Sequence, residues 1–371
     1  MKPKLYIVDP SRHITGAFKA AQNEAKLLSD IYDVVLVLPK ISTIEAKELQ
    51  LFSKVIYLPL YDLRKSLQAL FIYFPALFYS GWRLRSHLRE DNCELLQIND
   101  YYLMQGVVAR LFGFKGKIAT WVRIDHRRYG SFFSKYWLKL DYWASDAVVA
   151  VSNFILNILP NSDKNILIYD PVIDCTSQPD KSQKSDKKKI VYVGNYTEGK
   201  GQEHAVSAFA KIADRFPDVE LHFYGGDLGL EKNRRFKEKL EKQAQETPYF
   251  NRIHFHGFAK DTESVLHGAY IALNFSESES FSMACLEASA AAVSVIATKS
   301  GGPEEIVVDN KTGLLVERGD IDAMAEAMSI LLSDITKNRD YGQAGVLHMQ
   351  KVFSPVKFRQ KILSLFNGEV R

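Results

Sequence analysis

Short apolar runs alternate along the chain with longer stretches whose apolar residues recur at helical spacing. Runs of this kind, rich in Val, Ile and Leu and bounded by turn residues, predict buried β-strands. Strands that alternate with helices are expected to form parallel sheets, so the pattern predicts an α/β fold. The predicted strands are Lys4–Asp9, Val34–Pro39, Val55–Leu58, Leu95–Ile98, Ile118–Val122 and Ala147–Val151 in the first half, and Ile190–Gly194, Glu220–Tyr224, Arg252–Phe255, Ile271–Asn274, Val293–Ala297 and Gly313–Val316 in the second.

A polar segment without periodicity separates the two sets of strands. It runs from Asp174 to Lys189 (D-C-T-S-Q-P-D-K-S-Q-K-S-D-K-K-K) and has the composition of a linker or an exposed loop. A chain of 371 residues is long enough for two domains of ordinary size. We therefore expect a first domain over residues 1–173, a linker over 174–189 and a second domain from residue 190.

One uncharged segment of the first half stands apart from the rest of the chain. Leu67–Trp82 (L-Q-A-L-F-I-Y-F-P-A-L-F-Y-S-G-W) would be a helix of about 24 Å, shorter than the ~30 Å hydrocarbon core of a membrane. Pro75 would also bend it, so we do not expect a transmembrane span. Two interpretations remain, a helix buried in the first domain or an interfacial element on a membrane surface. Its basic neighbours are Arg64, Lys65, Arg83, Arg85 and Arg89.

Charge is distributed unequally between the two halves. Residues 1–172 carry 22 Lys and Arg against 16 Asp and Glu, a net +6, whereas the remainder carries a net −2. A basic half indicates an anionic partner, such as a membrane surface or a phosphorylated acceptor, although a mildly basic surface without a partner fits equally well.

Cysteine usage and the first residues indicate the compartment. Cys93, Cys175 and Cys285 are far apart and form no C-x-x-C pair, which argues against a disulfide scaffold or a zinc site. The apolar stretch Met1–Pro10 is too short for a signal peptide. We therefore expect a cytoplasmic protein.

A glycine-rich loop follows the first strand of the second half. It reads V-G-N-Y-T-E-G-K-G-Q-E, Val193 to Glu203, and places Lys200 among three glycines. Glycines let the backbone approach a phosphate, and an ammonium group supplies the opposite charge. The loop is not a Walker motif, because the spacing G-x-x-x-x-G-K-[ST] fails at Gln202. A Gly-Lys turn alone is common, so this signal is weak.

A second loop, S-E-S-E-S-F-S-M, ends where an apolar helix is predicted to begin. The amide groups of Phe281, Ser282 and Met283 would form an anion site at the start of that helix. Glu279 stands before it and Glu287 interrupts its apolar sequence, with no Lys or Arg within a turn. A buried carboxylate is costly unless it is paired, so Glu287 requires a distant side chain or a ligand. The two hydroxyls of a ribose would satisfy it.

These segments together resemble one enzyme family. G-N-Y-T-E-G-K-G, the E-x7-E pair of Glu279 and Glu287, and A-T-K-S-G-G-P-E-E-I-V-V-D-N-K-T-G-L-L-V are similar to the family 4 retaining glycosyltransferases of GT-B fold, over about residues 190–320. The resemblance implies two Rossmann-like, doubly wound domains that face each other across a cleft. The first domain would bind the acceptor and the second, residues 190–355, the nucleotide sugar. A final helix over residues 356–371 would cross back onto the first domain.

The resemblance also implies roles for single residues. Lys200 would bind the donor diphosphate, Glu287 the ribose and Glu279 the donor sugar, while the amides of residues 281–283 would hold sugar or phosphate. Gly16, in T-G-A-F at the start of the first helix, would bring its amide to the same phosphates. The implied donor-binding residues are Gly16, Gly194, Asn195, Lys200, Phe281, Ser282, Met283 and Glu287.

The sequence departs from the family pattern at three places. Gly194-Asn195 stands where the family often has Gly-Arg, which removes a cation, and Ser280 and Ser282 replace the glycines of E-G-F-G. The usual His-Asp pair of the first domain has its closest match in R-I-D-H-R-R, where Arg123, Asp125 or His126 would stand in. The implied catalytic residues are therefore Glu279, Lys200 and His126.

The resemblance implies a retaining, metal-independent glycosyltransferase of the hexosyltransferase class. It would move a sugar from a UDP- or GDP-linked donor to a saccharide acceptor, lipid-linked in envelope polysaccharide synthesis, on the inner face of the membrane. We expect no cofactor, no metal and no nucleic-acid partner. The alternative is a non-catalytic nucleotide-sugar-binding subunit of the same fold. A dinucleotide oxidoreductase is disfavoured, because no G-x-G-x-x-G follows the first strand.

Three other sets of residues receive ordinary interpretations. Asp320 and Asp322 form a D-x-D before an apolar helical run, where helix capping is a better explanation than metal binding. His254, His256 and His267 share no metal-binding spacing on one element and are expected to be solvated or packed. Trp121 and Trp137 are expected in the core.

Overall fold

The chain divides into two compact units. The computed structural model describes residues 2–61, 67–129, 131–173, 175 and 187–367. One unit comprises Met1–Pro171 with Pro355–Arg371, and the other comprises Val172–Ser354. Most of the predicted linker, residues 174 and 176–186, lies outside the described residues. The first strand of the second unit begins at Lys188, inside the segment predicted to be linker.

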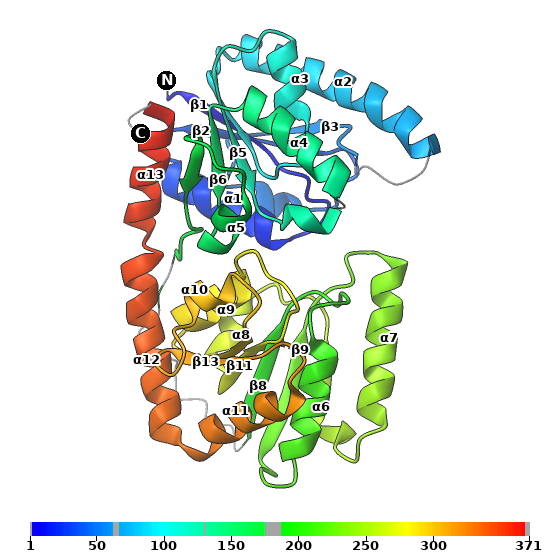
Figure 1. Cartoon of the computed structure of the whole chain (residues 1–371), viewed down its shortest axis with the longest axis vertical. Helices are drawn as coiled ribbons and strands as arrows, with labels where there is room; N and C mark the ends of the chain where they lie inside the picture. Colours follow the sequence, from blue (N-terminus) through cyan, green and yellow to red (C-terminus); the bar gives the residue numbers. More distant parts are fainter. Residues whose placement is uncertain (1, 62–66, 130, 174, 176–186, 368–371) are drawn as a thin grey trace. The chain divides into compact units, whose positions relative to one another are not determined.

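The first unit contains a seven-stranded parallel sheet in the order β3-β2-β1-β4-β5-β6-β7 (Figure 1). Its strands are buried on both faces, as the continuous apolar run of β2 (Asp33–Pro39) illustrates. The six predicted strands are confirmed, whereas the edge strand β7 was not predicted; it has only three residues, all half-buried. The other strands are β1 (Lys4–Val8), β3 (Lys54–Leu58), β4 (Leu95–Ile98), β5 (Lys117–Val122), β6 (Ala147–Ala150) and β7 (Asn165–Leu167).

Helices flank this sheet. Helix α1 buries a face made of Ala20, Ala21, Ala25 and Leu28, and Phe18 and Glu24 are buried with it. The last helix, α13, packs against the first unit: Arg359 pairs with Asp30, and the ring of Phe366 meets that of Tyr32 at 6.5 Å between centroids. The helices of this unit are α1 (Gly16–Leu28), α2 (Leu67–Glu90), α3 (Gln105–Leu111), α4 (Ser131–Ala144), α5 (Asn153–Ile158) and α13 (Pro355–Asn367).

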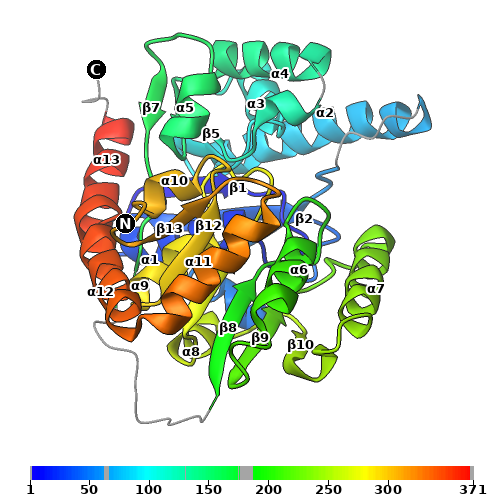
Figure 2. The same ribbon diagram turned by 60° about the horizontal axis from the view of Figure 1, so that its bottom comes forward.

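The second unit contains a six-stranded parallel sheet in the order β10-β9-β8-β11-β12-β13. Helices α6 and α11 lie side by side over one face in both views (Figure 1, Figure 2). The six strands are those that the apolar runs predict: β8 (Lys188–Val193), β9 (Val219–Tyr224), β10 (Ile253–His256), β11 (Ile271–Asn274), β12 (Ser294–Thr298) and β13 (Gly313–Val316). The helices are α6 (Gln202–Ile212), α7 (Glu231–Gln245), α8 (Thr262–His267), α9 (Met283–Ala290), α10 (Pro303–Ile306), α11 (Ile321–Ser333) and α12 (Ile335–Val352).

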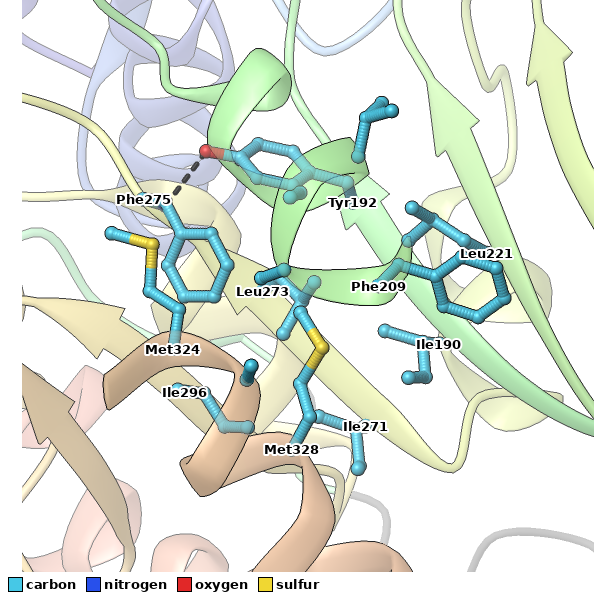
Figure 3. Packing of buried hydrophobic residues seen from close by; sticks show 14 of the residues in the cluster. Ile190, Tyr192, Phe209, Leu221, Ile271, Leu273, Phe275, Ile296, Met324 and Met328 are labelled. Atoms are coloured by element: carbon cyan, nitrogen blue, oxygen red, sulfur yellow. Dashed lines mark hydrogen bonds between the residues drawn. The ribbon is translucent and has the colours of Figure 1, made fainter. Parts of the chain in front are cut away.

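A core of aliphatic and aromatic side chains joins this sheet to its helices (Figure 3). Within it Tyr192 is fully buried, and its hydroxyl accepts a hydrogen bond of 2.7 Å from the amide of Phe275 (Figure 3). A buried phenol needs such a partner, because an unsatisfied hydroxyl would cost free energy. This bond ties the end of β11 to β8 beneath the loops that follow both strands.

Each sheet has one point at which the strand order reverses. In the first unit the reversal lies between β1 and β4, and in the second between β8 and β11. Loops at the carboxyl ends of the two strands diverge there, which makes this edge the usual place for a ligand in an open α/β sheet. The candidate site therefore begins with the loops after β8 and β11.

Candidate functional site

The loops after β8 and β11 bring together two residues that the resemblance assigns to the donor. The ammonium Nζ of Lys200 lies 2.6 Å from Oε1 of Glu279. The same oxygen accepts a hydrogen bond of 2.8 Å from the hydroxyl of Ser276. The Glu279 side chain is 14% exposed and that of Lys200 is 35% exposed, so the pair is shielded on the carboxylate side and open on the ammonium side.

The protonation state of Glu279 follows from these contacts. Burial raises its pKa, but the charge of Lys200 and the hydrogen bonds from Lys200, Ser276 and Asn274 act in the opposite direction and dominate, so the net pKa is lowered. Glu279 is therefore an ionised carboxylate at neutral pH. It can accept hydrogen bonds from hydroxyl groups but cannot donate a proton.

The glycine-rich turn needs its glycines because its backbone lies close to the loop after β11. Gly199 and Gly201 have φ values of 82° and 75°, a region that side chains rarely adopt. A Cβ at Gly201 would lie 2.0 Å from the carbonyl oxygen of Phe275. The amide of Glu277 also donates to the carbonyl of Gly199 at 2.9 Å. The backbone of the turn is thus pressed against the loop after β11, which fixes the place of Lys200.

The loop before α9 is held by Ser282. This residue has a φ of 94°, a conformation that favours the glycine of the family pattern. Its hydroxyl accepts hydrogen bonds from the side-chain amide of Asn274 at 2.9 Å and from the amide of Cys285 at 3.3 Å, so it caps α9. The first turn of a helix leaves N–H groups without acceptors inside the helix, and here that turn begins at Met283.

The loop after β12 completes this edge of the sheet. The amide of Glu279 donates to the carbonyl of Ser300 at 2.9 Å, and the amide of Gly302 donates to the carbonyl of Glu279 at 2.8 Å. A Cβ at Gly302 would lie 2.3 Å from Cα of Phe281, so only glycine fits there. The three loops that the sequence singled out therefore contact one another, with Glu279 between the other two.

Asn195, which stands where the family often has an arginine, makes a contact between two loops. Its side-chain oxygen accepts a hydrogen bond of 3.1 Å from the amide of Gly226, in the loop after β9. The amide of Gly194 donates to the carbonyl of Tyr224 at 2.9 Å. These two residues join the loops after β8 and β9, and the charge at this end of the site comes from Lys200.

Glu287 is half-buried on α9 between Leu286 and Ala288, which are buried. The helix packs on β11 and β12. The role proposed for Glu287 at a ribose stays a prediction.

In the first unit, the candidates lie near the carboxyl edge of the sheet. Gly16 is the exposed first residue of α1, where the hydroxyl of Thr15 accepts a hydrogen bond of 3.2 Å from the amide of Phe18. The positive end of this helix dipole therefore begins at Gly16.

Arg123 takes part in a buried network. Its guanidinium donates to both oxygens of Asp170, at 2.9 and 2.7 Å, and to the side-chain oxygen of Asn99 at 2.9 Å. The side chains of Arg123 and Asp170 are 7% and 5% exposed. Asn99 and Asp170 were not singled out in the sequence. Asn99 could have been, because it directly follows strand β4.

Asp125 and His126 differ in what surrounds them. The carboxylate of Asp125 accepts two hydrogen bonds from the guanidinium of Arg127, at 2.9 and 2.8 Å, and their mutual attraction lowers its pKa. His126 is nearly buried with its ring edge against Tyr101, and burial lowers its pKa. Among the described residues, its Nδ1 has no hydrogen-bond partner. Arg123 and Asp125 are each held by an ion pair, whereas His126 forms none with a described residue.

The structure also shows the surroundings of Asp320, Trp121 and His254. Asp320 accepts a hydrogen bond of 2.9 Å from the amide of Ala323 and caps α11, as predicted. Trp121 is fully buried, also as predicted. The expectation for His254 was incomplete: its ring lies 4.5 Å from that of His222 on the neighbouring strand, in a cluster that spacing along one element could not reveal.

Comparisons with known proteins place this geometry in context. Residues 175–347 match the family model of glycosyl transferases group 1. D-inositol 3-phosphate glycosyltransferase of Corynebacterium urealyticum is 33% identical over 151 residues, which are 40% of this chain and 35% of that protein. N-acetyl-alpha-D-glucosaminyl L-malate synthase of Bacillus anthracis is 30% identical over 217 residues, 54% of this chain and 53% of that protein. The matching part of the chain thus spans about half or less of these relatives.

The fold is also similar to that of solved glycosyltransferases. The structure of Anabaena Alr3699/HepE in complex with UDP-glucose aligns with a TM-score of 0.82 at 19% identity, over 98% of this chain and 99% of that one. Sucrose-phosphate synthase from Thermosynechococcus elongatus aligns with a TM-score of 0.80 at 19% identity, over 99% and 100%. The chain therefore has the GT-B fold of two Rossmann-like units, and its second unit carries the sequence pattern of group 1 glycosyltransferases.

Proposed function

We propose that the chain is a retaining glycosyltransferase that transfers a hexosyl group from a UDP- or GDP-linked donor. One observation carries the proposal: Lys200 and Glu279 meet at the switch point of the second sheet, beside the glycine-rich turn and the start of α9. A cation, a carboxylate and helix amides are the groups that a diphosphate and a sugar require. All three lie within the region that matches the family model.

The chemistry assigned to these residues is charge stabilisation. The bond between the anomeric carbon and the diphosphate oxygen breaks, and negative charge develops on the leaving diphosphate. Lys200 and the amides of the first turn of α9 stabilise that charge, which is the main source of acceleration in sites of this kind. An ammonium carries three N–H groups, so Lys200 can keep its contact with Glu279 while it donates to phosphate.

The remaining steps follow from the retained configuration. The acceptor hydroxyl attacks the anomeric carbon from the face that the diphosphate leaves, and its proton passes to the leaving phosphate oxygen. Glu279 orients the sugar hydroxyls as an ionised carboxylate, and Glu287 holds the ribose. We assign no protein nucleophile and no catalytic metal.

Gly16 and His126 are proposed as the contributions of the first unit. The exposed amide of Gly16 at the start of α1 suits a phosphate. Burial is the main cause of the lowered pKa of His126, and this shift favours the neutral imidazole. A neutral imidazole can accept a hydrogen bond from a sugar hydroxyl or donate one to it.

The acceptor is proposed to be a saccharide linked to a lipid. The chain resembles a GDP-mannose-dependent phosphatidylinositol monomannoside mannosyltransferase of Mycolicibacterium smegmatis, whose name describes such an acceptor. It also resembles poly(glycerol-phosphate) alpha-glucosyltransferase of Bacillus subtilis, whose acceptor is a polymer. A role in envelope polysaccharide synthesis rests on this similarity.

Helix α2 supports an association with the membrane surface. A helix buried in the unit would pack all its apolar residues inside it. Helix α2 instead buries one face (Tyr73, Leu77, Leu84 and Leu88) and leaves the opposite face exposed. The exposed face is Phe71 (81% exposed), Ile72, Phe74, Phe78, Tyr79 and Trp82. None of the helices in the described ranges is both long enough and apolar enough to cross a membrane.

Basic residues accompany this face. Arg89 is exposed on the last turn of α2, and Arg83 is half-buried one turn after Tyr79. Arg85 instead lies 6.0 Å from the ring centroid of Phe114, so its guanidinium is engaged within the unit. Arg64 and Lys65 lie outside the described residues. We propose that α2 lies on the anionic inner surface of the membrane, with its aromatic face in the interface.

Donor turnover by the purified chain tests the function. UDP- and GDP-linked hexoses are incubated with the chain, with and without lipid-linked saccharides, and released nucleoside diphosphate is measured. We expect release from one donor, and NMR of the product should show a retained anomeric configuration. Thermal stabilisation by a nucleoside diphosphate without any turnover would instead identify a non-catalytic binding subunit. An inverted product would contradict the retaining mechanism.

Vesicle sedimentation tests the membrane surface. The parent should bind vesicles with phosphatidylserine and release them as salt rises, because each nearby cation contributes about 1 kcal/mol. The variant Phe74→Ser/Phe78→Ser should lose most binding. The control Ile335→Ser/Leu347→Ser removes two apolar residues of α12 that are more exposed than Phe74 and Phe78, and it should bind like the parent. Equal binding by the α2 variant, or none by the parent, would contradict the proposal.

A further inference from the structure

A second cluster of ligand-type side chains lies on the outer strands of the second unit. Glu220 and His222 stand two residues apart on β9, so their side chains point to the same face of the sheet. His254 of the edge strand β10 is the register partner of His222. The core residues Leu221 and Phe223 occupy the other face. The three polar side chains therefore converge on the face away from that core.

The distances suit a metal ion. One ligand atom from each of Glu220, His222 and His254 can be chosen such that all lie within 4.8 Å of one another. Oε2 of Glu220 lies 3.3 Å from Nε2 of His222 and 3.6 Å from Nε2 of His254. Bonds of about 2.0–2.2 Å at tetrahedral angles separate two ligand atoms by about 3.3–3.6 Å. The side chains are thus near the spacing that such an ion requires.

The burial of these groups is unusual without a ligand. Glu220 and His222 are buried, and Nε2 of His254 is shielded from solvent and makes no hydrogen bond within the described part of the chain. A buried nitrogen without a partner costs free energy, so its retention on this face calls for an occupant.

Neighbouring groups orient the ligands. Nδ1 of His222 lies 3.1 Å from Nε2 of His256. When the proton of His222 is on Nδ1, that nitrogen donates a hydrogen bond to His256. Nε2 of His222 then has a lone pair on the side of Glu220. Ligand histidines commonly have such a partner on their second nitrogen. Lys187 pairs with the other carboxylate oxygen, Oε1, and leaves Oε2 for the ion.

We propose that Glu220, His222 and His254 bind one Zn²⁺ or a similar divalent transition-metal ion, with His256 holding the ring of His222. Two imidazoles and a carboxylate form a ligand set typical of zinc, and a fourth position is left for water. The ion would link the edge strand β10 to β9. The ion would stabilise the unit and would take no part in sugar transfer. Lys200 and Glu279 follow the carboxyl ends of β8 and β11, whereas Glu220 stands near the amino end of β9.

Calorimetry with ZnCl₂ on the chelator-treated, tag-free chain tests the proposal. We expect one ion per chain, a higher melting temperature, and with Co²⁺ the intense visible absorption of a tetrahedral site. His254→Ala and Glu220→Gln should lower zinc affinity by more than about 100-fold, and His256→Ala by about 10- to 100-fold. Circular dichroism without metal checks that each variant is folded; His254 is half-exposed, so its replacement should be tolerated.

The matched control is His267→Ala. His267 lies 3.7 Å from Glu263 on α8, which makes it a histidine–carboxylate pair outside the cluster. Its replacement should leave zinc affinity unchanged. A parent that does not bind zinc, or a folded His254→Ala variant that binds like the parent, would overturn the proposal. Nucleoside diphosphate affinity, measured on the same samples, should be the same with and without zinc, so this test is independent of the proposed transferase activity.

Discussion

Replacing Lys200 with Met is the sharpest test of the donor site. The substitution removes the ammonium and keeps an unbranched side chain of similar length, so the glycine-rich turn should keep its backbone. A charge-assisted hydrogen bond contributes about 1.5–3 kcal/mol. Loss of one such contact should therefore weaken nucleoside diphosphate binding by about 10- to 150-fold, because each 1.4 kcal/mol corresponds to about tenfold.

The substitution also affects the free protein. Lys200 pairs with Glu279, whose side chain is 14% exposed, and its loss leaves that carboxylate with the hydrogen bonds from Ser276 and Asn274. We expect the unfolding free energy to fall by about 1–3 kcal/mol, between the values for exposed and buried pairs. The double variant Lys200→Met/Glu279→Gln should recover part of this loss, because it removes the uncompensated charge.

The assay is isothermal calorimetry with UDP and GDP, after urea denaturation has shown that each variant is fully folded at the assay temperature. Lys299→Met is the matched control: its ammonium also lies 2.6 Å from a carboxylate, that of Glu317, and it follows the nearby strand β12. This control should leave affinity unchanged. Parent-like affinity in Lys200→Met, or an equal loss in Lys299→Met, would refute the assignment.

Three further outcomes are expected. Glu287→Gln should lower donor affinity by about tenfold and leave apo stability unchanged or higher, whereas a large fall in apo melting temperature with unchanged affinity would show a structural role. Gly302→Ala should cost about 1–3 kcal/mol in urea denaturation and weaken nucleotide binding, because its Cβ would lie 2.3 Å from Phe281, while Gly257→Ala, with no atom within 4 Å, should be neutral. The pKa of Glu279 lies below its ordinary value of 4.5, so the ionised carboxylate stabilises the chain at pH values above 4.5. This contribution is lost as the pH falls through the lowered pKa, so the free energy of unfolding should fall more steeply below about pH 4.5 in the parent than in Glu279→Gln.

Local sequence determined the elements of this protein. Apolar runs such as those of β2 and β11 predict their strands because a strand buried on both faces is apolar at nearly every position. The glycines at 199 and 201 predict a tight turn because φ values above zero are costly for other residues. These requirements are local, so one sequence is enough to find them. The strand β7 was not predicted, because its three residues are too few to establish a periodicity.

The orientation of α2 could not be read from the sequence. Almost all residues of its first four turns are apolar, so no polar stripe marks the side that faces solvent. Packing against α3 decides which face is buried, and this packing leaves Phe71, Phe74 and Phe78 exposed. The contacts of α2 with neighbouring helices, and not its composition, therefore distinguish a buried helix from an element with an exposed apolar face.

The partners of the charged residues were decided by the order of the strands. Lys200 and Glu279 are 79 residues apart, and they meet because β8 and β11 are neighbours at the switch point. His222 and His254 belong to separate strands and become neighbours through the parallel register of β9 and β10. Alternating polar residues in E-L-H-F-Y and I-H-F-H were visible in the sequence, but their common face was not. Contacts of this kind depend on which strands pair, and strand pairing is set by the packing of the whole sheet and its helices.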